Sequence, residues 1–329
     1  EKGKSMNLYP LRLEPQVKEI VWGGRWLAEE LGRPAANPEA KLGESWEAYS
    51  DSLVTNGPLA GRKLADLFNE DAARYFGAKS QSYPKFPLLV KFIDARENLS
   101  VQVHPDNFLA QQLENYPYGK TEFWYVMKAQ PGAEICYGLN ETAQNLDQLE
   151  KAMSELDLLR YLQKAPVKEG DVVYLPAGTV HALTKGIVVY ELQQDTDITY
   201  RLYDWGRVGR QIHIEKGLKA IKLDNPNPKV THPALEPKES YASARLVESE
   251  YFTADLYSVT DRAELQAKPD SFTLLSVLEG SGTLEPTTSL FEDEPLAKGQ
   301  TLLMPPGLDF RLVSTGSEKP LKVISGTIR

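Results

Sequence analysis

An internal repeat constrains the fold of this chain more than any other feature of its sequence. Residues 167–183 read VKEGDVVYLPAGTVHAL, and residues 296–312 read LAKGQTLLMPPGLDFRL. The two segments align without a gap and share the pairs Gly170 and Gly299, Pro176 and Pro305, and Gly178 and Gly307. Upstream, TEFWYVMKA at 121–129 and FTLLSVLEG at 272–280 share their apolar pattern. The repeat predicts two copies of one β unit.

Short β-branched and aromatic runs predict strands over much of the chain. These runs are Leu88–Ala95, Leu99–His104, Phe123–Lys128, Asp171–Leu175, Gly186–Gln193, Phe252–Val259, Ser271–Leu278, Gln300–Met304 and Leu321–Ile328. Most are bounded by Gly, Pro or Asn, which is typical of an antiparallel sandwich or barrel. Helical periodicity predicts insertions on this scaffold at Arg25–Leu31, Lys63–Phe76, Asn107–Asn115 and Leu146–Gln163.

The length of the chain favours two domains. At 329 residues it exceeds the usual size of one hydrophobic core. The segment 223–237, LDNPNPKVTHPALEP, is rich in Pro and Asn and lacks periodicity, so it is the predicted boundary. We therefore expect one domain at 1–235, with helical insertions, and a second at 236–329.

Charge and cysteine content exclude several classes of protein. The net charge of −9 is the wrong sign for a protein that binds a phosphate backbone, so no nucleic-acid partner is expected. With Cys136 as the single cysteine, neither an internal disulfide nor a CxxC zinc site can form, and a metal would need His, carboxylate or amide ligands. No apolar window of about 18 residues occurs. We expect a soluble, cytoplasmic protein that binds no membrane; its oligomeric state stays open.

Four polar side chains stand in positions that suit metal chemistry. Gln102 and His104 are two residues apart on a predicted strand, so both leave the same face. Glu122 begins a strand behind a turn that contains Lys120. His181 follows a turn punctuated by glycine and proline, which would aim its imidazole back into the β scaffold. The second copy of the repeat has lost these groups, since His181 aligns with Phe310 and Glu122 with Thr273.

These strings resemble those of a known superfamily. GDVVYLPAGTVH, at 170–181, resembles the second motif of the cupin barrels, and QVH, at 102–104, resembles a variant of the first in which Gln replaces the first His. The distance from His104 to Glu122 exceeds the usual cupin gap, so an insertion containing the helix at 107–115 is expected.

The order of further motifs is similar to that of the type I phosphomannose isomerases. The matching strings are Tyr9-Pro10, WGG at 22–24, GESW at 43–46, FPLLVK at 86–91, QVHPD at 102–106, KTE at 120–122, PAGTVHA at 176–182 and Tyr200-Arg201. The chain most resembles short bacterial members, whose C-terminal domain is a metal-free second barrel. The resemblance implies a mainly β fold of two cupin-type jelly-roll barrels with helical insertions in the N-terminal half.

The resemblance also implies an activity and its residues. It implies a zinc-dependent isomerase of mannose 6-phosphate and fructose 6-phosphate, with one Zn²⁺ per chain bound by Gln102, His104, Glu122 and His181. Arg201 would stabilise the enediolate. Lys120 and Asp197 are rival bases for the proton transfer, and a nearby zinc ion and Arg201 would favour the neutral amine of Lys120.

The residues that could contact the substrate could also have purely structural roles. Arg207, Ser100 and Lys91 could hold the phosphate group of a small phosphosugar. Arg201 and Arg207 could instead form surface ion pairs, and Lys91 could be a buried stem with a solvated head. Trp22 and Trp46 could line the sugar site or pack in the core, and Glu191 is implied as a nearby carboxylate. Two other functions stay open: an Fe(II)-dependent cupin oxygenase and a non-catalytic sugar-binding cupin.

Overall fold

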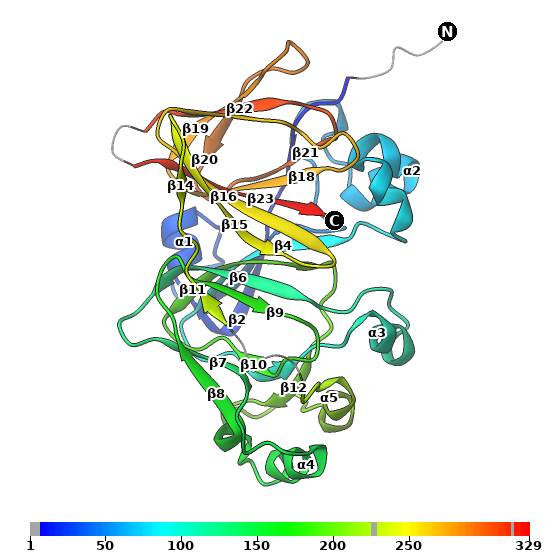
Figure 1. Ribbon diagram of the computed structural model, residues 1–329, viewed down its shortest axis with the longest axis vertical. Helices are drawn as coiled ribbons and strands as arrows, with labels where there is room; N and C mark the ends of the chain where they lie inside the picture. The colour runs from blue at the N-terminus through cyan, green and yellow to red at the C-terminus, as the bar shows by residue number, and fades with distance from the viewer. Residues whose placement is uncertain (1–6, 225–228, 317–318) are drawn as a thin grey trace. The chain divides into compact units, whose positions relative to one another are not determined.

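The computed structural model describes residues 7–224, 229–316 and 319–329, and this part of the chain is mainly β (Figure 1). It divides into two compact units. Unit 1 contains the described residues up to 16, together with 47–88 and 233–329, and unit 2 contains 17–46 and 89–232. The prediction of a mainly β chain is confirmed. The domain boundary expected near residue 235 stays a prediction, and residues 225–228 of the expected linker lie outside the described residues.

Unit 2 is built on two sheets. The order of the larger sheet is β13 (Val230–Thr231), β9 (Val172–Leu175), β6 (Glu122–Ala129), β11 (Ile187–Gln194), β4 (Leu88–Ala95), β2 (Gln16–Gly24) and β3 (Leu42–Ala48). Figure 1 shows β9, β6 and β11 side by side. The smaller sheet has the order β12 (Tyr200–Tyr203), β5 (Val101–Val103), β10 (His181–Ala182), β7 (Glu134–Leu139) and β8 (Leu162–Pro166). The helices of this unit are α1 (Trp26–Leu31), α3 (Asn107–Glu114), α4 (Leu146–Ser154), η3 (Leu158–Tyr161) and α5 (Ile214–Ala220).

Unit 1 also contains two sheets. The larger has the order β1 (Leu11–Arg12), β21 (Thr301–Met304), β18 (Thr273–Glu279), β23 (Leu321–Ile328), β16 (Phe252–Val259), β15 (Tyr241–Glu248) and β14 (Glu236–Pro237). The smaller has the order β17 (Arg262–Leu265), β22 (Phe310–Ser314), β19 (Ser281–Pro286) and β20 (Glu294–Ala297). Its helical segments are η1 (Gly57–Leu59), α2 (Leu64–Phe76) and η2 (Ala78–Ser82). Phe76 of α2 packs against Phe86 and Phe272, with ring centroids 5.5 and 5.7 Å apart.

Each copy of the repeat forms its own pair of antiparallel strands, and the two pairs match residue for residue. In unit 2, Glu122 of β6 pairs with Leu175 of β9; in unit 1, the aligned Thr273 of β18 pairs with Met304 of β21. The turn before each second strand is also repeated, because Gly170 N donates to Val126 O and Gly299 N donates to Val277 O, both at 2.8 Å. Both glycines have positive φ, +88° and +84°, which explains why glycine is kept at this position. The predicted repeat is confirmed as a repeated two-strand unit.

Most predicted elements lie where the sequence placed them. The bounds of β4, β16 and β23 agree residue for residue with the predicted strands. The helix predicted over Leu146–Gln163 is wrong beyond Ser154, because Leu156 adopts a left-handed φ of +59° that ends the helix. Leu158 and Tyr161 then continue the apolar spacing from a 3₁₀ turn, and β8 follows. The strands and α-helix of the described residues that were not predicted are β1, β2, β3, β7, β8, β10, β12, β13, β14, β15, β17, β19, β20, β22 and α5.

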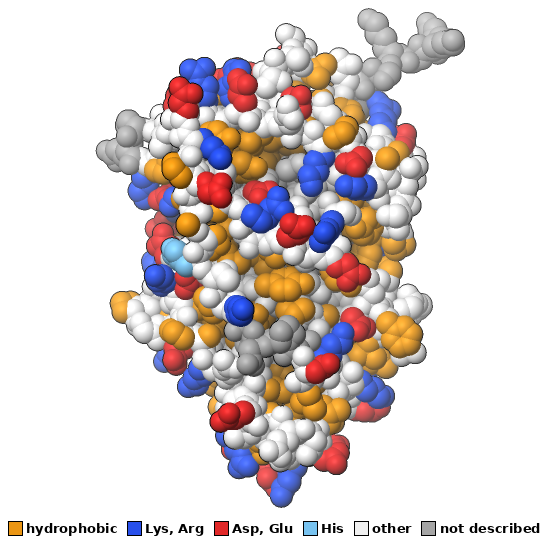
Figure 2. Space-filling model, viewed as in Figure 1, with side chains coloured by type: hydrophobic (Ala, Val, Ile, Leu, Met, Phe, Trp, Pro, Cys, Tyr) orange, Lys and Arg blue, Asp and Glu red, His pale blue; other side chains and the backbone are white. Residues whose placement is uncertain are grey.

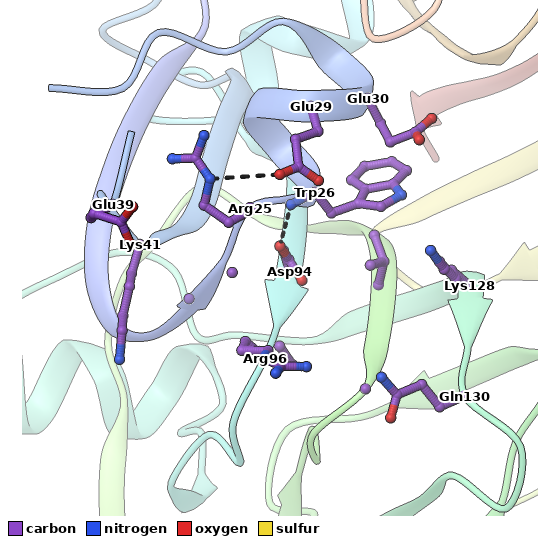
Figure 3. A pocket seen from close by; sticks show the side chains of 15 residues that line it. Arg25, Trp26, Glu29, Glu30, Glu39, Lys41, Asp94, Arg96, Lys128 and Gln130 are labelled. Carbon is purple, nitrogen blue, oxygen red and sulfur yellow. Dashed lines mark hydrogen bonds and ion pairs between the residues drawn. The ribbon is translucent and has the colours of Figure 1, made fainter. Parts of the chain in front are cut away.

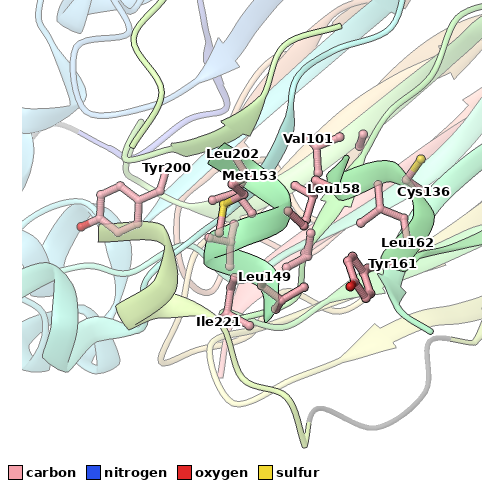
Figure 4. Packing of buried hydrophobic residues seen from close by; sticks show 14 of the residues in the cluster. Val101, Cys136, Leu149, Met153, Leu158, Tyr161, Leu162, Tyr200, Leu202 and Ile221 are labelled. Carbon is pink, nitrogen blue, oxygen red and sulfur yellow. The ribbon is translucent and has the colours of Figure 1, made fainter. Parts of the chain in front are cut away.

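Helix α4 and the second copy of the repeat each contribute side chains to an apolar core cluster. In unit 2, α4 closes one end of the smaller sheet: Figure 4 shows Leu149 and Met153 packed with Leu158 and Leu202. In unit 1, Phe310 is 2% exposed and belongs to the cluster between the sheets. The residue aligned with His181 is therefore a core side chain.

The described surface shows no concentration of one sign of charge on the face in Figure 2, where basic and acidic side chains alternate. In the described part of the chain, no helix has both the length and the hydropathy needed to span a membrane.

Candidate active site

The insertion between His104 and Glu122 ends beside the residue where it begins. Strand β5 ends at Val103, and the Asp106 side chain accepts a hydrogen bond from Leu109 N, which caps α3. After the helix, Lys120 N donates to Pro105 O at 2.9 Å, so Lys120 and Glu122 lie beside His104 despite their distance in sequence. The predicted insertion with its helix is confirmed.

Three polar residues form a row across the smaller sheet of unit 2. Gln102 of β5 is the direct partner of His181 on β10 and of Arg201 on β12. Directly paired residues on neighbouring strands project from the same face, so these three side chains share one face. His181 Nδ1 lies 2.8 Å from Thr179 O, in the segment after the left-handed Gly178 (φ +92°).

His104, Glu122 and His181 converge on one point. Their ligand atoms all lie within 4.8 Å of one another, and the three residues are 2%, 0% and 1% exposed. The Nε2 atoms of His181 and His104 lie 3.3 and 3.8 Å from Glu122 Oε1. Gln102 Nε2 is 3.4 Å from His181 Nε2, and Ser100 donates to Gln102 Oε1. The four residues predicted as metal ligands are thus neighbours.

The protonation of this group suits a cation. Nδ1 of His104 and of His181 each face a backbone carbonyl, of Ile198 and Thr179, which can only accept a hydrogen bond. In a neutral ring the lone pair then resides on Nε2, which points toward the Glu122 carboxylate. Burial and the charge of Lys120 hold the pKa of His104 well below its ordinary value, so its ring is neutral.

Among the described residues, two of the three converging groups, His104 and Glu122, have ligand atoms without a hydrogen-bond partner. His104 Nε2 and Glu122 Oε1 are buried and make no hydrogen bond there. Burial alone would raise the pKa of Glu122, but Lys120, 3.2 Å from Oε2, and the two imidazoles hold it well below its ordinary value. Buried lone pairs that face one another are satisfied by a metal ion, and imidazole rings oriented through Nδ1 are typical of metal ligands. The residues present fit a divalent metal.

A polar cavity of about 290 Å³ opens beside this group. Its walls come entirely from unit 2 and carry most of the residues predicted for catalysis and substrate binding. The lining includes Lys18, Trp22, Glu44, Lys91, Ser100, Gln102, Lys120, Trp124, Glu191, Asp197, Arg201 and Arg210. Trp22 is 3% exposed and also packs in the core of the unit, so it serves both as a core residue and as cavity wall.

Lys91 is buried among carboxylates at the cavity wall. Its Nζ lies 3.4 Å from Glu191 Oε1 and 3.7 Å from Glu44 Oε2. Burial would lower the pKa of Lys91, but the two carboxylates outweigh it and raise that pKa. Burial would raise the pKa of Glu44, but Lys91 and the hydrogen bond from the Trp46 indole N–H outweigh burial and lower that pKa. For Glu191, burial and the neighbouring Glu122 dominate and raise the pKa. Lys91 is not a snorkelling side chain, since its ammonium is inside the unit.

The remaining predicted residues differ in their placement. Arg201 lies on the cavity wall, where Nη1 donates to Gln211 O at 2.8 Å and Nε is buried without a partner among the described residues. Asp197 is at the rim, with its side chain 64% exposed and 3.9 Å from Lys18. Arg207 pairs with Asp204 at 2.7 Å and is absent from the described cavity lining.

Sequence reasoning missed three charged residues of the cavity lining. Lys18 stacks on the Trp46 ring at 3.2 Å from its centroid, Glu44 pairs with Lys91, and Arg210 pairs with Asp204. Glu44 was within a family-like string but was given no role. Lys18 and Arg210 belong to no motif, and no local pattern in the sequence marks them.

A larger cavity of about 520 Å³ lies elsewhere in unit 2 (Figure 3). It contains none of the predicted site residues, and its four basic and four acidic side chains offset one another. Figure 3 shows two of its polar groups already satisfied: Arg25 lies 3.7 Å from Glu29, and Asp94 accepts a hydrogen bond from Trp26 N. Volume alone does not identify the functional cavity, and the convergence of unpartnered polar atoms is the better guide.

Comparisons with known proteins relate this chain to one enzyme family. The family model of the phosphomannose isomerase type I catalytic domain matches residues 10–126. The mannose-6-phosphate isomerase ManA of Bacillus subtilis is 37% identical over 319 residues, covering 93% of this chain and 96% of its own. The mannose-6-phosphate isomerase of Streptococcus mutans is 36% identical and covers 90% and 92%. The crystal structure of the mannose 6-phosphate isomerase from Bacillus subtilis superposes with a TM-score of 0.85 at 32% identity, covering 96% and 99%. The chain belongs to the type I phosphomannose isomerase family.

Proposed function

We propose that this chain interconverts mannose 6-phosphate and fructose 6-phosphate by moving a proton between C1 and C2 through an enediolate. The observation that carries the proposal is the buried group His104, Glu122 and His181, whose ligand atoms converge beside a polar cavity lined by Lys120 and Arg201, with His104 Nε2 and the Glu122 oxygens lacking a partner among the described residues. The names of relatives that match over almost the whole chain support mannose 6-phosphate as the substrate.

We propose that one Zn²⁺ per chain is held by His104, Glu122 and His181 through the atoms described above. Gln102 would join them through Oε1 after rotation of its amide, which now presents Nε2 to His181. Nitrogen and carboxylate oxygen are common zinc ligands, and no thiolate is needed. The ion would act as a Lewis acid toward the oxygens of the substrate.

The chain's own residues would supply charge stabilisation and proton transfer. Arg201 would donate to the oxygen that becomes negative in the enediolate, because its guanidinium lines the cavity and its buried Nε is unused. Between the two candidate bases, burial favours Lys120, which is 4% exposed, over Asp197 at the exposed rim. A base shielded from bulk water keeps the proton it removes available for return to the neighbouring carbon.

Further parts of the proposal concern substrate and fold. Ser100, Trp22, Lys91, Glu191 and Arg207 are proposed as substrate-binding residues; the first four line the cavity. We further propose that each unit is a cupin-type jelly roll, consistent with the strand pair that the two units share. The cytoplasmic location stays a prediction.

A coupled assay for fructose 6-phosphate formed from mannose 6-phosphate tests the function. We expect turnover that a chelator abolishes and zinc restores. A chain that forms no fructose 6-phosphate after loading with Zn²⁺, Mn²⁺ or Co²⁺ contradicts the proposal. Oxygen uptake by the Fe(II)-loaded chain would instead support an oxygenase, and sugar binding without turnover would support a binding protein.

A further inference from the structure

We propose that Arg210, positioned by the buried carboxylate of Asp204, is the residue that binds the phosphate group of the substrate. This inference rests on the proposed function, since it assigns one end of the substrate of that same site. Arg210 belongs to none of the sequence motifs, and the assignment differs from the sequence prediction, which named Arg207, Ser100 and Lys91 as possible phosphate-binding residues.

The segment that carries these arginines is a tightly bent loop after β12. Trp205, Gly206 and Gly209 all have positive φ, at +56°, +76° and +85°. A left-handed tryptophan is uncommon and needs support from its surroundings. Trp205 Nε1 donates to Leu99 O at 2.6 Å, which ties the loop to a residue of the cavity wall. The bend returns the chain so that Arg210 faces the cavity.

Asp204 fixes the position of Arg210. Its side chain is 2% exposed and lies 3.0 and 3.2 Å from Arg210 Nη1 through its two oxygens. Arg207 Nη2 binds the same carboxylate at 2.7 Å, but Arg207 is not among the described residues of the cavity lining. The bonds to Asp204 engage only Nη1 of Arg210, so Nη2 and Nε are left to make a two-point contact with an anion.

The net charge of the group formed by Arg201, Arg207, Arg210 and Asp204 is opposite to that of a phosphate monoester. The guanidinium groups of Arg201, Arg207 and Arg210 interact with the single carboxylate of Asp204, which leaves an excess of two positive charges. Burial, followed by the repulsion of Arg210, lowers the pKa of Arg201. Arg201 and Arg207 also each bury an Nε with no partner among the described residues. A phosphate monoester carries a charge of about −1.5 to −2 at neutral pH, so it would neutralise this excess.

The test compares Arg210→Ala with Arg207→Ala in the zinc-loaded protein. For Arg210→Ala we expect KM for mannose 6-phosphate to rise about 10- to 100-fold, the loss typical of one charge-assisted contact, while kcat changes less than about 3-fold. The Kd of inorganic phosphate, measured by calorimetry without turnover, should rise by a similar factor. Binding of unphosphorylated mannose should not change. Arg207→Ala should raise KM less than Arg210→Ala does.

Two further variants sharpen the test. Asp204→Asn keeps Arg210 but removes its support, so it should raise KM and the phosphate Kd without changing mannose binding. Arg160→Ala is the matched control, because Arg160 pairs with Asp157 at 2.9 Å on an exposed surface and should leave every constant unchanged. The inference is overturned if Arg210→Ala leaves the phosphate Kd within 2-fold, if mannose binding falls equally, or if Arg207→Ala has the larger effect. Calorimetry keeps these outcomes separate from a failure of the isomerase activity.

Discussion

Replacing Lys91 with methionine should destabilise the protein strongly, although methionine is apolar and similar in length. Lys91 is 2% exposed and neutralises two buried carboxylates, those of Glu44 and Glu191. At an effective dielectric constant of about 20, charges at these distances of 3.7 and 3.4 Å attract by roughly 4.5 and 4.9 kcal/mol. Desolvation of Lys91 offsets part of this attraction. We expect a net loss of about 3–5 kcal/mol in the free energy of unfolding, because two buried carboxylates lose their counter-charge.

The loss should depend on pH in a defined direction. Without Lys91, burial would raise the folded-state pKa of Glu44 above the unfolded value and would raise the pKa of Glu191, which is already elevated, further, so folding would take up protons. The destabilisation is then full at pH 8 and diminishes as the pH falls through these raised pKa values. In the unsubstituted protein the pKa of Glu44 is lowered, so its stabilising contribution persists above the unfolded pKa and is lost only as the pH falls through the folded value. Lys91 itself, with a raised pKa, stays charged across this range.

Urea unfolding of metal-free protein at pH 8 and pH 5.5, followed by tryptophan fluorescence, measures both effects. Lys41→Met is the matched control, because Lys41 lies 3.7 Å from Glu97 on the surface and should cost at most about 1 kcal/mol. A loss for Lys91→Met below about 1 kcal/mol at pH 8, or the same loss at both pH values, would refute the reasoning.

Three further predictions concern the metal, the enediolate and the second repeat. His181→Ala should lose bound zinc and isomerase activity together, since a removed ligand is rarely replaced; full zinc occupancy by elemental analysis would contradict the ligand assignment. Arg201→Ala with zinc retained should lower kcat about 100-fold or more, roughly 3 kcal/mol, with little change in KM, and Arg201→Lys should recover little of it; near-normal kcat in both would remove Arg201 from the mechanism. Phe310→Ala should cost about 3–5 kcal/mol in unfolding experiments because it leaves a cavity in the core of unit 1, while zinc content stays the same; loss of zinc would show that the second repeat is more than structural.

Local sequence patterns correctly predicted the elements whose conformation depends mainly on residues adjacent in the sequence. Strand β4 is buried at every position and apolar at all but Lys91 and Asp94, so its bounds could be read directly. The glycines of the repeat were recognisable because each turn needs a positive φ. The helix predicted to Gln163 overran its true end because Leu158 and Tyr161 are buried at helical spacing after the chain has already left the helix. Helix α5 was missed because it is short and contains Gly217, which weakens its helical propensity.

The sequence identified only part of the candidate site, for a different reason. His104, Glu122 and His181 stand in motifs, and the backbone pairing of β5 with β10 brings two of these strands together. Lys18, Glu44 and Arg210 reach the cavity from distant segments, and their partners are chosen by the fold. Arg207 and Arg210 show the same limit, because they are three residues apart and only the folded loop shows that Arg210 lines the cavity.

Stepwise return of zinc to the metal-free protein tests the central claim most directly. Metal content and the rate of fructose 6-phosphate formation are measured on the same samples, with His181→Ala as the control. If His104, Glu122 and His181 hold the ion required for isomerisation, activity should rise in proportion to bound zinc and reach its maximum at one equivalent per chain, and the variant should stay inactive. Full activity in the metal-free protein, or zinc-dependent activity in the variant equal to that of the unsubstituted protein, would contradict the account.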